Sequence, residues 1–320
     1  MKRRQLLQLG TAGALGAAGV AVHAQAAWPN KPIRIIVGYA AGGGNDVLAR
    51  LLAQKLQESL GQTVVVENRP GVAAIVGTDA VAKAPPDGYT LMVTASGPIV
   101  FNPALYAKLP YAPRDFAPVS LMVRFPLLLV VKNDGPRNLA ELVAFSKANP
   151  EKTNYGSSAA SFRLVTELLK SKAGLSAEHV PYKGSNESVN AVVGGQVTMT
   201  LCDPLPAVGP MKGGLVRAIG VTSARRTALL PDVPTLAEQG VDLDITLWSG
   251  LMAPAGTPPA IVQRLSAEVQ RINRLPEMRE RFATLMVEDA SGPPEAFART
   301  IEAELPLWAQ VARANNIKAD

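Results

Sequence analysis

Residues 33–60 read IRIIVGYAAGGGNDVLARLLAQKLQESL and combine a strand, a glycine-rich turn and a helix. Ile33–Val37 is a short apolar run that is typical of a strand. From about Asp46, apolar residues recur at helical spacing until Gly61, which predicts a helix that ends there. A strand-to-helix turn presents unpaired N–H groups and the positive end of the helix dipole to whatever lies above the strand. The stretch therefore predicts an anion-binding site.

The glycine turn differs from the common nucleotide-binding motifs. Gly38 and Gly42–Gly44 do not match the G-x-G-x-x-G spacing, and no Gly-Lys-Ser/Thr follows to bind a phosphate and Mg²⁺. A purely structural turn is the alternative, because glycine also serves tight connections. Three consecutive glycines exceed what a turn needs, and Asp46 can cap its own helix from the first turn, which would leave the earlier N–H groups of the loop free. We therefore expect this loop to bind a carboxylate.

The first 26 residues have the composition of an export signal. Residues 2–4 are Lys-Arg-Arg, an Ala/Gly/Leu-rich run follows at Leu6–Val22, and Ala24–Ala26 fits the small-x-small cleavage rule. We expect cleavage after Ala26 and a periplasmic mature chain. A membrane anchor is the alternative, but the run is short and glycine-rich and lacks a second set of flanking charges. The paired arginines leave both the Sec and the twin-arginine route open.

Composition excludes several classes of protein. The formal charge is +6 over 320 residues and falls to +3 without the three cations of the signal, and the basic residues are scattered. That charge is too mild for a nucleic-acid-binding protein, so no nucleic-acid partner is expected. Cys202 is the lone cysteine, so the exported fold must rely on core packing without an internal disulfide. The length of the mature chain favours two domains.

Strand-like runs alternate with helical patterns along the mature chain, which predicts an α/β fold of two lobes, each a mostly parallel sheet flanked by helices. The apolar run Phe116–Lys132 is long enough to pass from one lobe into the other, and Leu247–Ala253 is expected to cross back. We assign residues 1–26 to the signal, 27–125 and 248–320 to lobe 1, and 126–247 to lobe 2. Further strands are expected at Val64–Val66, Tyr89–Thr94, Thr153–Tyr155, His179–Tyr182, Val197–Cys202 and Val216–Val221. Further helices are expected at Ile75–Lys83, from the cap Asn138 to Ala148, at Ser161–Ala173, at Ser185–Val193 and over most of the chain after Thr257.

Catalytic and metal-binding patterns are mostly absent. The mature chain has one histidine, His179, so a histidine-rich metal site cannot form, and no Glu/His pair has zincin spacing. No G-x-S-x-G motif is present, and a packed histidine is the more common finding in a strand-like run. Cys202 ends an apolar strand, which favours a buried inert thiol. We expect no metal, no cofactor and no enzymatic activity.

A second polar turn, Gly156–Ser161, follows a short strand and precedes a helix. The hydroxyls and N–H groups of its serines could bind the far end of a small polar ligand, although an ordinary serine-rich helix start is an equal alternative. Arg163 adds a fixed guanidinium fork in the first helical turn, suited to bidentate carboxylate binding, while a lone arginine is more often solvated. Asp203 directly follows a strand, at the position where α/β proteins bind ligands.

Beyond these local features, the chain from Trp28–Ile33 onward resembles the exported substrate-binding proteins of tripartite tricarboxylate transporters, the Bug family. The resemblance spans essentially all of the mature sequence. It is carried by ordered blocks at Tyr39–Asp46, Val64–Gly71, Pro86–Leu91, Asp115–Val119, His179–Gly184, Leu230–Thr235 and Trp248–Leu251, the last leading into Ala253–Pro258.

This resemblance implies a two-lobed periplasmic binding fold that closes on a small organic carboxylate and delivers it to a membrane permease. The Tyr39–Asp46 loop would hold the carboxylate, partly through bridging waters, and the turn at Gly71–Gly77 would face the same cleft. Second-lobe groups would select among acids. The candidate ligand-binding residues are Tyr39, Ala40, Gly42, Gly43, Gly44, Asn45, Asp46, Ala73, Ala74, Ser96, Ser157, Ser158, Arg163 and Asp203.

The chain departs from the family pattern near both turns. Gly38 and Ala41 stand where prolines are common, which should loosen the loop, and Val72–Ala74 replaces a more glycine-rich turn. Arg163 occupies a frequent histidine position. We hypothesise that Arg163 binds a second carboxylate and favours a dicarboxylate.

Two other functions stay open at this point. A sensory binder would present its ligand to a receptor kinase instead of a permease, and the sequence does not separate the two. An exported hydrolase would use Ser157 or Ser158 as its nucleophile, but no general base is evident beside them. The leading hypothesis is a monomeric, non-catalytic carboxylate receptor.

Overall fold

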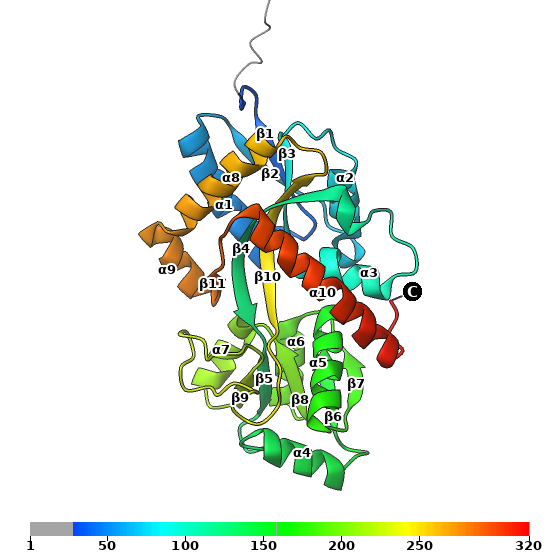
Figure 1. Ribbon diagram of the computed structural model, residues 1–320. Coiled ribbons are helices and arrows are strands. Elements are labelled where there is room, and N and C mark those ends of the chain that lie inside the picture. The colour runs from blue at the N-terminus through cyan, green and yellow to red at the C-terminus, as the bar shows by residue number, and fades with distance from the viewer. Residues whose placement is uncertain (1–27, 158, 320) are drawn as a thin grey trace, which may run out of the picture.

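A computed structural model describes residues 28–157 and 159–319 of the chain. The expected signal and the candidate residue Ser158 lie outside the described residues. Figure 1 shows two lobes, one above the other, each built on its own β-sheet with helices against it. The predicted two-lobed α/β fold is thereby confirmed.

The upper sheet takes its strands from both ends of the chain and the lower sheet from the middle (Figure 1). The upper strand order is β11-β4-β10-β3-β1-β2, and the lower order is β7-β6-β8-β5-β9. The upper strands are β1 (Ile33–Val37), β2 (Val64–Asn68), β3 (Thr90–Ala95), β4 (Phe116–Pro126), β10 (Thr246–Pro254) and β11 (Glu288–Asp289). The lower strands are β5 (Leu128–Lys132), β6 (Asn154–Ser157), β7 (Glu178–Pro181), β8 (Met199–Cys202) and β9 (Val216–Val221).

Helices connect the strands within each lobe. Those of the upper lobe are α1 (Gly44–Leu60), α2 (Ile75–Ala82), α3 (Asn102–Leu105), α8 (Pro259–Asn273), α9 (Pro276–Leu285) and α10 (Pro294–Ala314). Short helical turns lie at η1 (Val72–Ala74), η2 (Gly97–Phe101) and η3 (Pro113–Asp115). The lower lobe contains α4 (Leu139–Ala148), α5 (Ala160–Ala173), α6 (Ser185–Val193) and α7 (Pro204–Lys212).

The first helix shows how the sequence sets these elements. Leu48, Leu52 and Leu56 recur every four residues and are buried against the upper sheet. Gly61 ends α1 with a φ of 67°, a left-handed conformation that glycine adopts without steric cost. The helix begins at Gly44, two residues earlier than predicted.

Both sheets are mixed. β1 is parallel to β2 and β3, and β6 is parallel to β7 and β8, as expected for strands that helices connect. The crossing strands β4, β10 and β5 run antiparallel to their neighbours. The expectation of mostly parallel sheets is thus corrected for these strands. They differ because the chain passes between the sheets without an intervening helix, and β10 returns beside β4 in the opposite direction (Figure 1).

The long helix α10 packs across β4 and reaches α5 of the lower lobe, as Figure 1 shows. Trp308 of α10 is 1% exposed, and its ring lies 4.4 Å from that of Phe101, centroid to centroid. Burial of a large apolar side chain stabilises a fold by about 1.5–3 kcal/mol. One apolar cluster extends from the upper lobe into the lower lobe and includes Trp308 and Phe101.

Candidate functional site

The carboxyl ends of the parallel strands lie beside the chain crossings in both lobes. In the upper sheet, Ala95 at the end of β3 pairs with Ser249, near the start of β10. In the lower sheet, Cys202 at the end of β8 pairs with Leu128, at the start of β5. We call these two borders the interlobe edges. Ligands of open α/β sheets bind beyond the carboxyl ends of the strands, so these edges are where a site is expected.

Helix N-termini lie along both interlobe edges. In the upper lobe α1 and α2 follow β1 and β2, and in the lower lobe α5, α6 and α7 follow β6, β7 and β8. Each helix N-terminus carries unpaired N–H groups and about half a positive charge. The two edges together therefore favour an anion.

The loop before α1 carries half of the candidate residues. Residues 40–44 are exposed, and Gly43 is the N-cap of α1 without a side-chain hydrogen bond. Within the described chain, no protein acceptor takes the N–H groups of Gly44, Asn45 or Asp46. Asp46 lies in the first turn of α1, as predicted, but its carboxylate accepts the N–H of Gly42, so that one N–H of the loop is not free. The free donors expected for an anion are nevertheless present.

Asp46 holds the loop in place. Its carboxylate, 2% exposed, accepts hydrogen bonds from the Gly42 N–H (2.8 Å), from Arg50 Nε (3.0 Å) and from Asn68 Nδ2 (2.9 Å). Burial works to raise the pKa of Asp46, but these hydrogen bonds outweigh it and lower the pKa below its ordinary value. Asn68 also donates to the carbonyl of Tyr39 at 3.1 Å. The carboxylate is thus engaged within the protein and positions the loop.

Sequence reasoning missed Arg50 and Asn68 as functional residues. Arg50 follows Asp46 by four positions, the spacing at which helical side chains meet, and that signal was available. Asn68 ends β2, which lies next to β1 in the sheet. Only the strand pairing brings Asn68 to the loop.

Three more candidates lie in the same loop or follow β3. Asn45 Oδ1 accepts a hydrogen bond from the Ser249 hydroxyl at 2.8 Å, which ties the loop to the crossing strand β10. Tyr39 packs against the upper core, and burial raises the pKa of its hydroxyl far above the ordinary range. Ser96 is buried where β3 ends and η2 begins. Tyr39 and Asn45 thus connect the loop to the upper core and to β10.

The second upper turn touches the first. Ala73 and Ala74 adopt φ values of 49° and 60°, which residues other than glycine rarely adopt. Asn102 Nδ2 donates to the carbonyl of Ala73 at 3.0 Å. A Cβ on Gly38 would lie 2.7 Å from Cβ of Ala74, and one on Gly77 would lie 2.7 Å from Cα of Gly38. Glycine at position 38 is therefore required for close packing, a role that its position in the sequence did not reveal.

The lower interlobe edge contains a serine–histidine pair. Ser157 Oγ lies 2.8 Å from Nε2 of His179 on the neighbouring strand, and Ser157 is 4% exposed. The ring of Tyr155 lies 5.2 Å from that of His179, centroid to centroid. The sequence-based argument that Ser157 lacks a general base is wrong, because strand pairing places the histidine beside it.

Electrostatics around His179 oppose a hydrolytic role. Burial and the positive charges of Arg163 and Lys170 lower the pKa of His179, against a smaller opposing effect from Glu167. A catalytic histidine needs a neighbour that stabilises the imidazolium ion. Glu167 instead accepts a hydrogen bond from Tyr155 (2.6 Å) and pairs with Lys170 (2.9 Å). The arrangement suits a neutral histidine that orients Ser157.

Arg163 lies in the first turn of α5, as predicted. Its positive charge acts to lower the pKa of both Tyr155 and His179. Its Nε is buried and has no hydrogen-bond acceptor among the residues that the structure describes. A buried donor without an acceptor is rare, and a ligand oxygen that reached it would satisfy it.

Asp203 connects two helix starts on the lower edge. It is the N-cap residue of α7, and its Oδ1 accepts a hydrogen bond from the Ser185 hydroxyl at 2.6 Å, at the start of α6. Burial raises the pKa of Asp203. A carboxyl group at this place can accept a hydrogen bond from a hydroxyl or ammonium group of a ligand.

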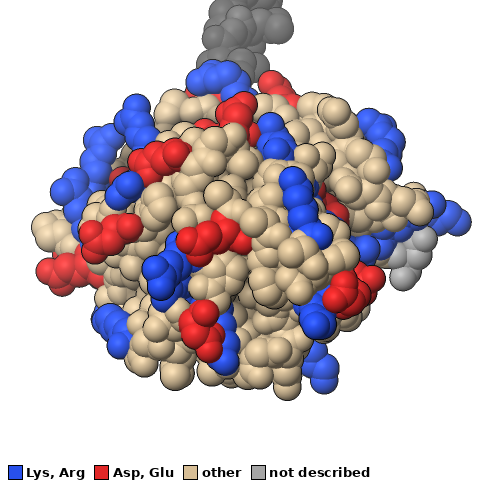
Figure 2. All heavy atoms as spheres, turned by 90° about the horizontal axis from the view of Figure 1, so that it is seen from below, with Lys and Arg blue, Asp and Glu red and all other residues tan. Residues whose placement is uncertain are grey.

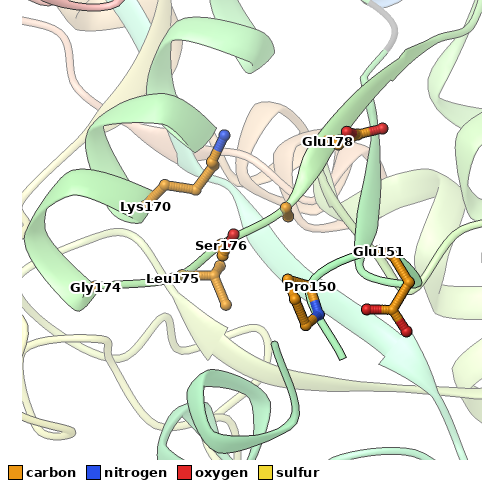
Figure 3. A pocket seen from close by; sticks show the side chains of 8 residues that line it. Pro150, Glu151, Lys170, Gly174, Leu175, Ser176 and Glu178 are labelled. Atoms are coloured by element: carbon orange, nitrogen blue, oxygen red, sulfur yellow. The ribbon is translucent and has the colours of Figure 1, made fainter. Parts of the chain in front are cut away.

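Other features lie away from the interlobe edges. Figure 3 shows a surface depression of about 560 Å³ at the opposite end of the lower lobe, where α5 ends and β7 begins. It is lined by Pro150, Glu151, Lys170, Gly174, Leu175, Ser176, Ala177 and Glu178.

Figure 2 shows basic and acidic residues interspersed over the face seen from below. Of the described helices, none is both long and apolar enough to cross a membrane, and no described cluster of His, Cys, Asp and Glu is placed to bind a metal ion.

Comparisons with known proteins agree with this geometry. The TctC family, described as Tripartite tricarboxylate transporter family receptor, matches residues 48–317. Protein BugT of Bordetella pertussis is 35% identical over 315 residues, which cover 95% of each chain. The solved structure of Rpa4515 from R. palustris with adipate is 33% identical, covers 91% of this chain and 99% of its own, and has a TM-score of 0.80.

The solved structure of MatC from Rhodopseudomonas palustris with bound malate is also similar. It is 30% identical, covers 88% of this chain and 99% of its own, and has a TM-score of 0.75. The TctC match extends over most of the chain, and the BugT match over nearly all of it. The chain therefore belongs to the tripartite tricarboxylate transporter receptor family, TctC.

Proposed function

We propose that this chain is an exported receptor that closes its two lobes around a small organic carboxylate and delivers it to a tripartite tricarboxylate-type permease. The observation that carries the proposal is the set of free N–H groups on Gly44, Asn45 and Asp46, held at the upper interlobe edge opposite the helix starts of the lower lobe. Relatives solved with adipate and malate support a carboxylate ligand. Closure would be driven by tighter binding in the closed form.

Residue roles follow from this placement. The loop Tyr39–Asp46 would bind one carboxylate, directly or through water, beside the turn at Ala73 and Ala74. Ser157 and Asp203 would bind the far part of the ligand from the lower lobe. The guanidinium of Arg163, with its unused Nε donor, would bind a second carboxylate and favour dicarboxylates.

A thermal-shift screen of the mature chain against mono-, di- and tricarboxylates and aromatic acids tests the receptor function. An acid at about 100 times its dissociation constant should stabilise the native state by about 2.7 kcal/mol. We expect a response to at least one acid, with malate and adipate as the first probes. A flat response to every acid would contradict the proposal.

Calorimetry of Arg163→Ala tests the second carboxylate. We expect the affinity for a dicarboxylate to fall by about tenfold or more, because a charged hydrogen bond is lost, while a matched monocarboxylate changes little. Lys170→Ala is the control, since that side chain is already paired with Glu167. Equal dicarboxylate affinity in Arg163→Ala and the parent chain would show that Arg163 does not bind the second carboxylate.

The remaining parts of the proposal concern the whole protein. We propose cleavage after Ala26, a periplasmic monomer, and lobe limits at 27–125 with 248–320 and at 126–247. The hydrolase alternative has a specific observation in its favour, the contact of Ser157 with His179. If the chain cleaves a p-nitrophenyl ester and Ser157→Ala abolishes that cleavage, the non-catalytic assignment is wrong.

A further inference from the structure

A groove of about 320 Å³ lies between α1 and α9 on the upper lobe. Val47, Leu51 and Leu285 give it apolar walls, and Arg50 and Arg281 give it positive charge. No acidic side chain is found among the described residues that line it. The groove thus combines an apolar interior with two arginines, of which Arg50 is paired with Asp46 and Arg281 forms no ion pair with a described residue.

The occupant must be anionic, apolar in part and larger than the groove. The side chains of Arg50 and Arg281 lie largely in solvent, so a small molecule in the groove would stay partly exposed, whereas ligand pockets bury about 70–90% of their ligand. Guanidinium groups bind carboxylates in bidentate fashion. A protein segment with an apolar side chain next to an Asp or Glu meets these requirements.

Arg50 connects the groove to the ligand loop. Its guanidinium binds both carboxylate oxygens of Asp46, at 3.0 and 2.9 Å, and Asp46 in turn fixes the N–H of Gly42. A partner carboxylate that bonds to Arg50 would compete with Asp46 and loosen the hold on Gly42. A partner that receives the ligand gains from such a connection, because docking would then promote release.

We propose that the groove between α1 and α9 is the docking site for a periplasmic segment of the membrane permease, which inserts an apolar side chain beside an acidic one. The proposal rests on the receptor function proposed above. It adds the surface, the chemistry of the partner segment and a route from docking to the ligand loop.

Removal of a single charge on α9 tests the surface. Arg281 and Arg279 are both exposed, and neither forms an ion pair within the described part of the chain, but only Arg281 lines the groove. Arg281→Gln should lower permease-dependent uptake by about tenfold or more at limiting receptor, because the charge that attracts the acidic residue is lost. Glutamine brings no carboxylate that could compete with Asp46 for Arg50, so the calorimetric affinity for the acid identified in the screen should stay within about twofold. Arg279→Gln should change neither quantity.

These measurements separate two failures. If the parent chain binds no acid and supports no uptake, the receptor function itself is wrong. If the parent binds and transports normally and Arg281→Gln matches Arg279→Gln, only the docking site is wrong.

A cross-link tests docking without knowledge of the ligand. Thr284→Cys places a thiol in the groove for a photo-reactive label, and the native Cys202 is buried and stays unlabelled. With membranes that contain the permease, we expect an adduct with a permease subunit that Arg281→Gln suppresses. Arg279→Cys, labelled in the same way, is the control. No adduct, an equal adduct from both labels, or an adduct only with a second copy of the chain would overturn the proposal.

Discussion

Thr222 and Leu127 exchange two hydrogen bonds at the point where the chain passes between the lobes. The N–H of Leu127 donates to Oγ1 of Thr222 at 2.9 Å, and the N–H of Thr222 donates to the carbonyl of Leu127 at 3.1 Å. The Thr222 hydroxyl also donates to the carbonyl of Ile245 at 2.6 Å, just before β10 begins. One buried threonine therefore joins both crossing segments, and any hinge motion must turn around it.

Replacing Thr222 with valine should weaken the hinge strongly. Thr222→Val keeps the shape but leaves the N–H of Leu127 and the carbonyl of Ile245 buried without this partner. We expect the free energy of unfolding to fall by about 2–4 kcal/mol, measured by urea denaturation. Thr222→Ser retains the hydroxyl and is the control. A Thr222→Val variant as stable as the parent chain would show that the hydroxyl does not stabilise the hinge.

Replacing Ala73 with glycine should stabilise the chain. The left-handed conformation of Ala73 costs about 1–2 kcal/mol, which exceeds the gain in unfolded-state entropy that glycine brings, about 0.4–1 kcal/mol. We expect a net gain of about 0.5–1 kcal/mol in the free energy of unfolding. Ala303→Gly, at an exposed position inside α10, should instead lose about 1 kcal/mol. A loss in Ala73→Gly would contradict the strain at this turn.

Replacing Asp46 with asparagine should affect both stability and ligand binding. The folded pKa of Asp46 is lowered, so its contribution to stability is present above its ordinary pKa of about 3.9 and is lost as the pH falls through the folded value. Asp46→Asn should reduce that acid sensitivity and lower the free energy of unfolding at pH 7 by about 1.5–3 kcal/mol. Ligand affinity should also fall, because the loop loses its anchor at Gly42.

The exposed ion pair of Lys31 with Asp87 provides the control for that experiment. Both side chains are about half exposed, and such pairs contribute less than about 1 kcal/mol. Asp87→Asn should therefore leave the acid limb of the stability curve and the ligand affinity nearly unchanged. If Asp87→Asn and Asp46→Asn behave alike, the carboxylate of Asp46 does not anchor the loop.

Glu304 should make the fold less stable as the pH rises toward neutrality. Burial raises the pKa of Glu304 to about 7, although the hydrogen bond from Trp248 Nε1 (3.0 Å) and the charge of Arg124 oppose this. Between the unfolded pKa of about 4.3 and the folded value, the native state holds a proton that the unfolded state has released, so stability decreases across that interval. Glu304→Gln should flatten the stability curve between pH 5 and 7, measured by urea unfolding, because glutamine still accepts from Trp248 without titrating. If Glu304→Gln leaves the stability curve unchanged, Glu304 does not cause the decrease in stability between pH 5 and 7.

The local elements were predictable because their signals are local. The leucine spacing of α1, the glycine at its end and the asparagine cap at Asn138, whose Oδ1 accepts the N–H of Glu141 at 2.8 Å, all act within a few residues. The run Phe116–Lys132 was identified as a crossing, and it forms β4 and β5 in different sheets. Strand directions at the crossings were not predictable, because pairing joins residues more than a hundred positions apart.

The sequence by itself determined the glycine loop before α1, with its free N–H groups, and the arginine at the start of α5. Only the tertiary structure decided what surrounds them. Strand pairing brings Asn68 to Asp46 and His179 to Ser157, and it packs Gly38 against Ala74. The physical reason is that a hydrogen bond needs atoms within about 3 Å, and separation along the chain does not set that distance until the sheets have formed.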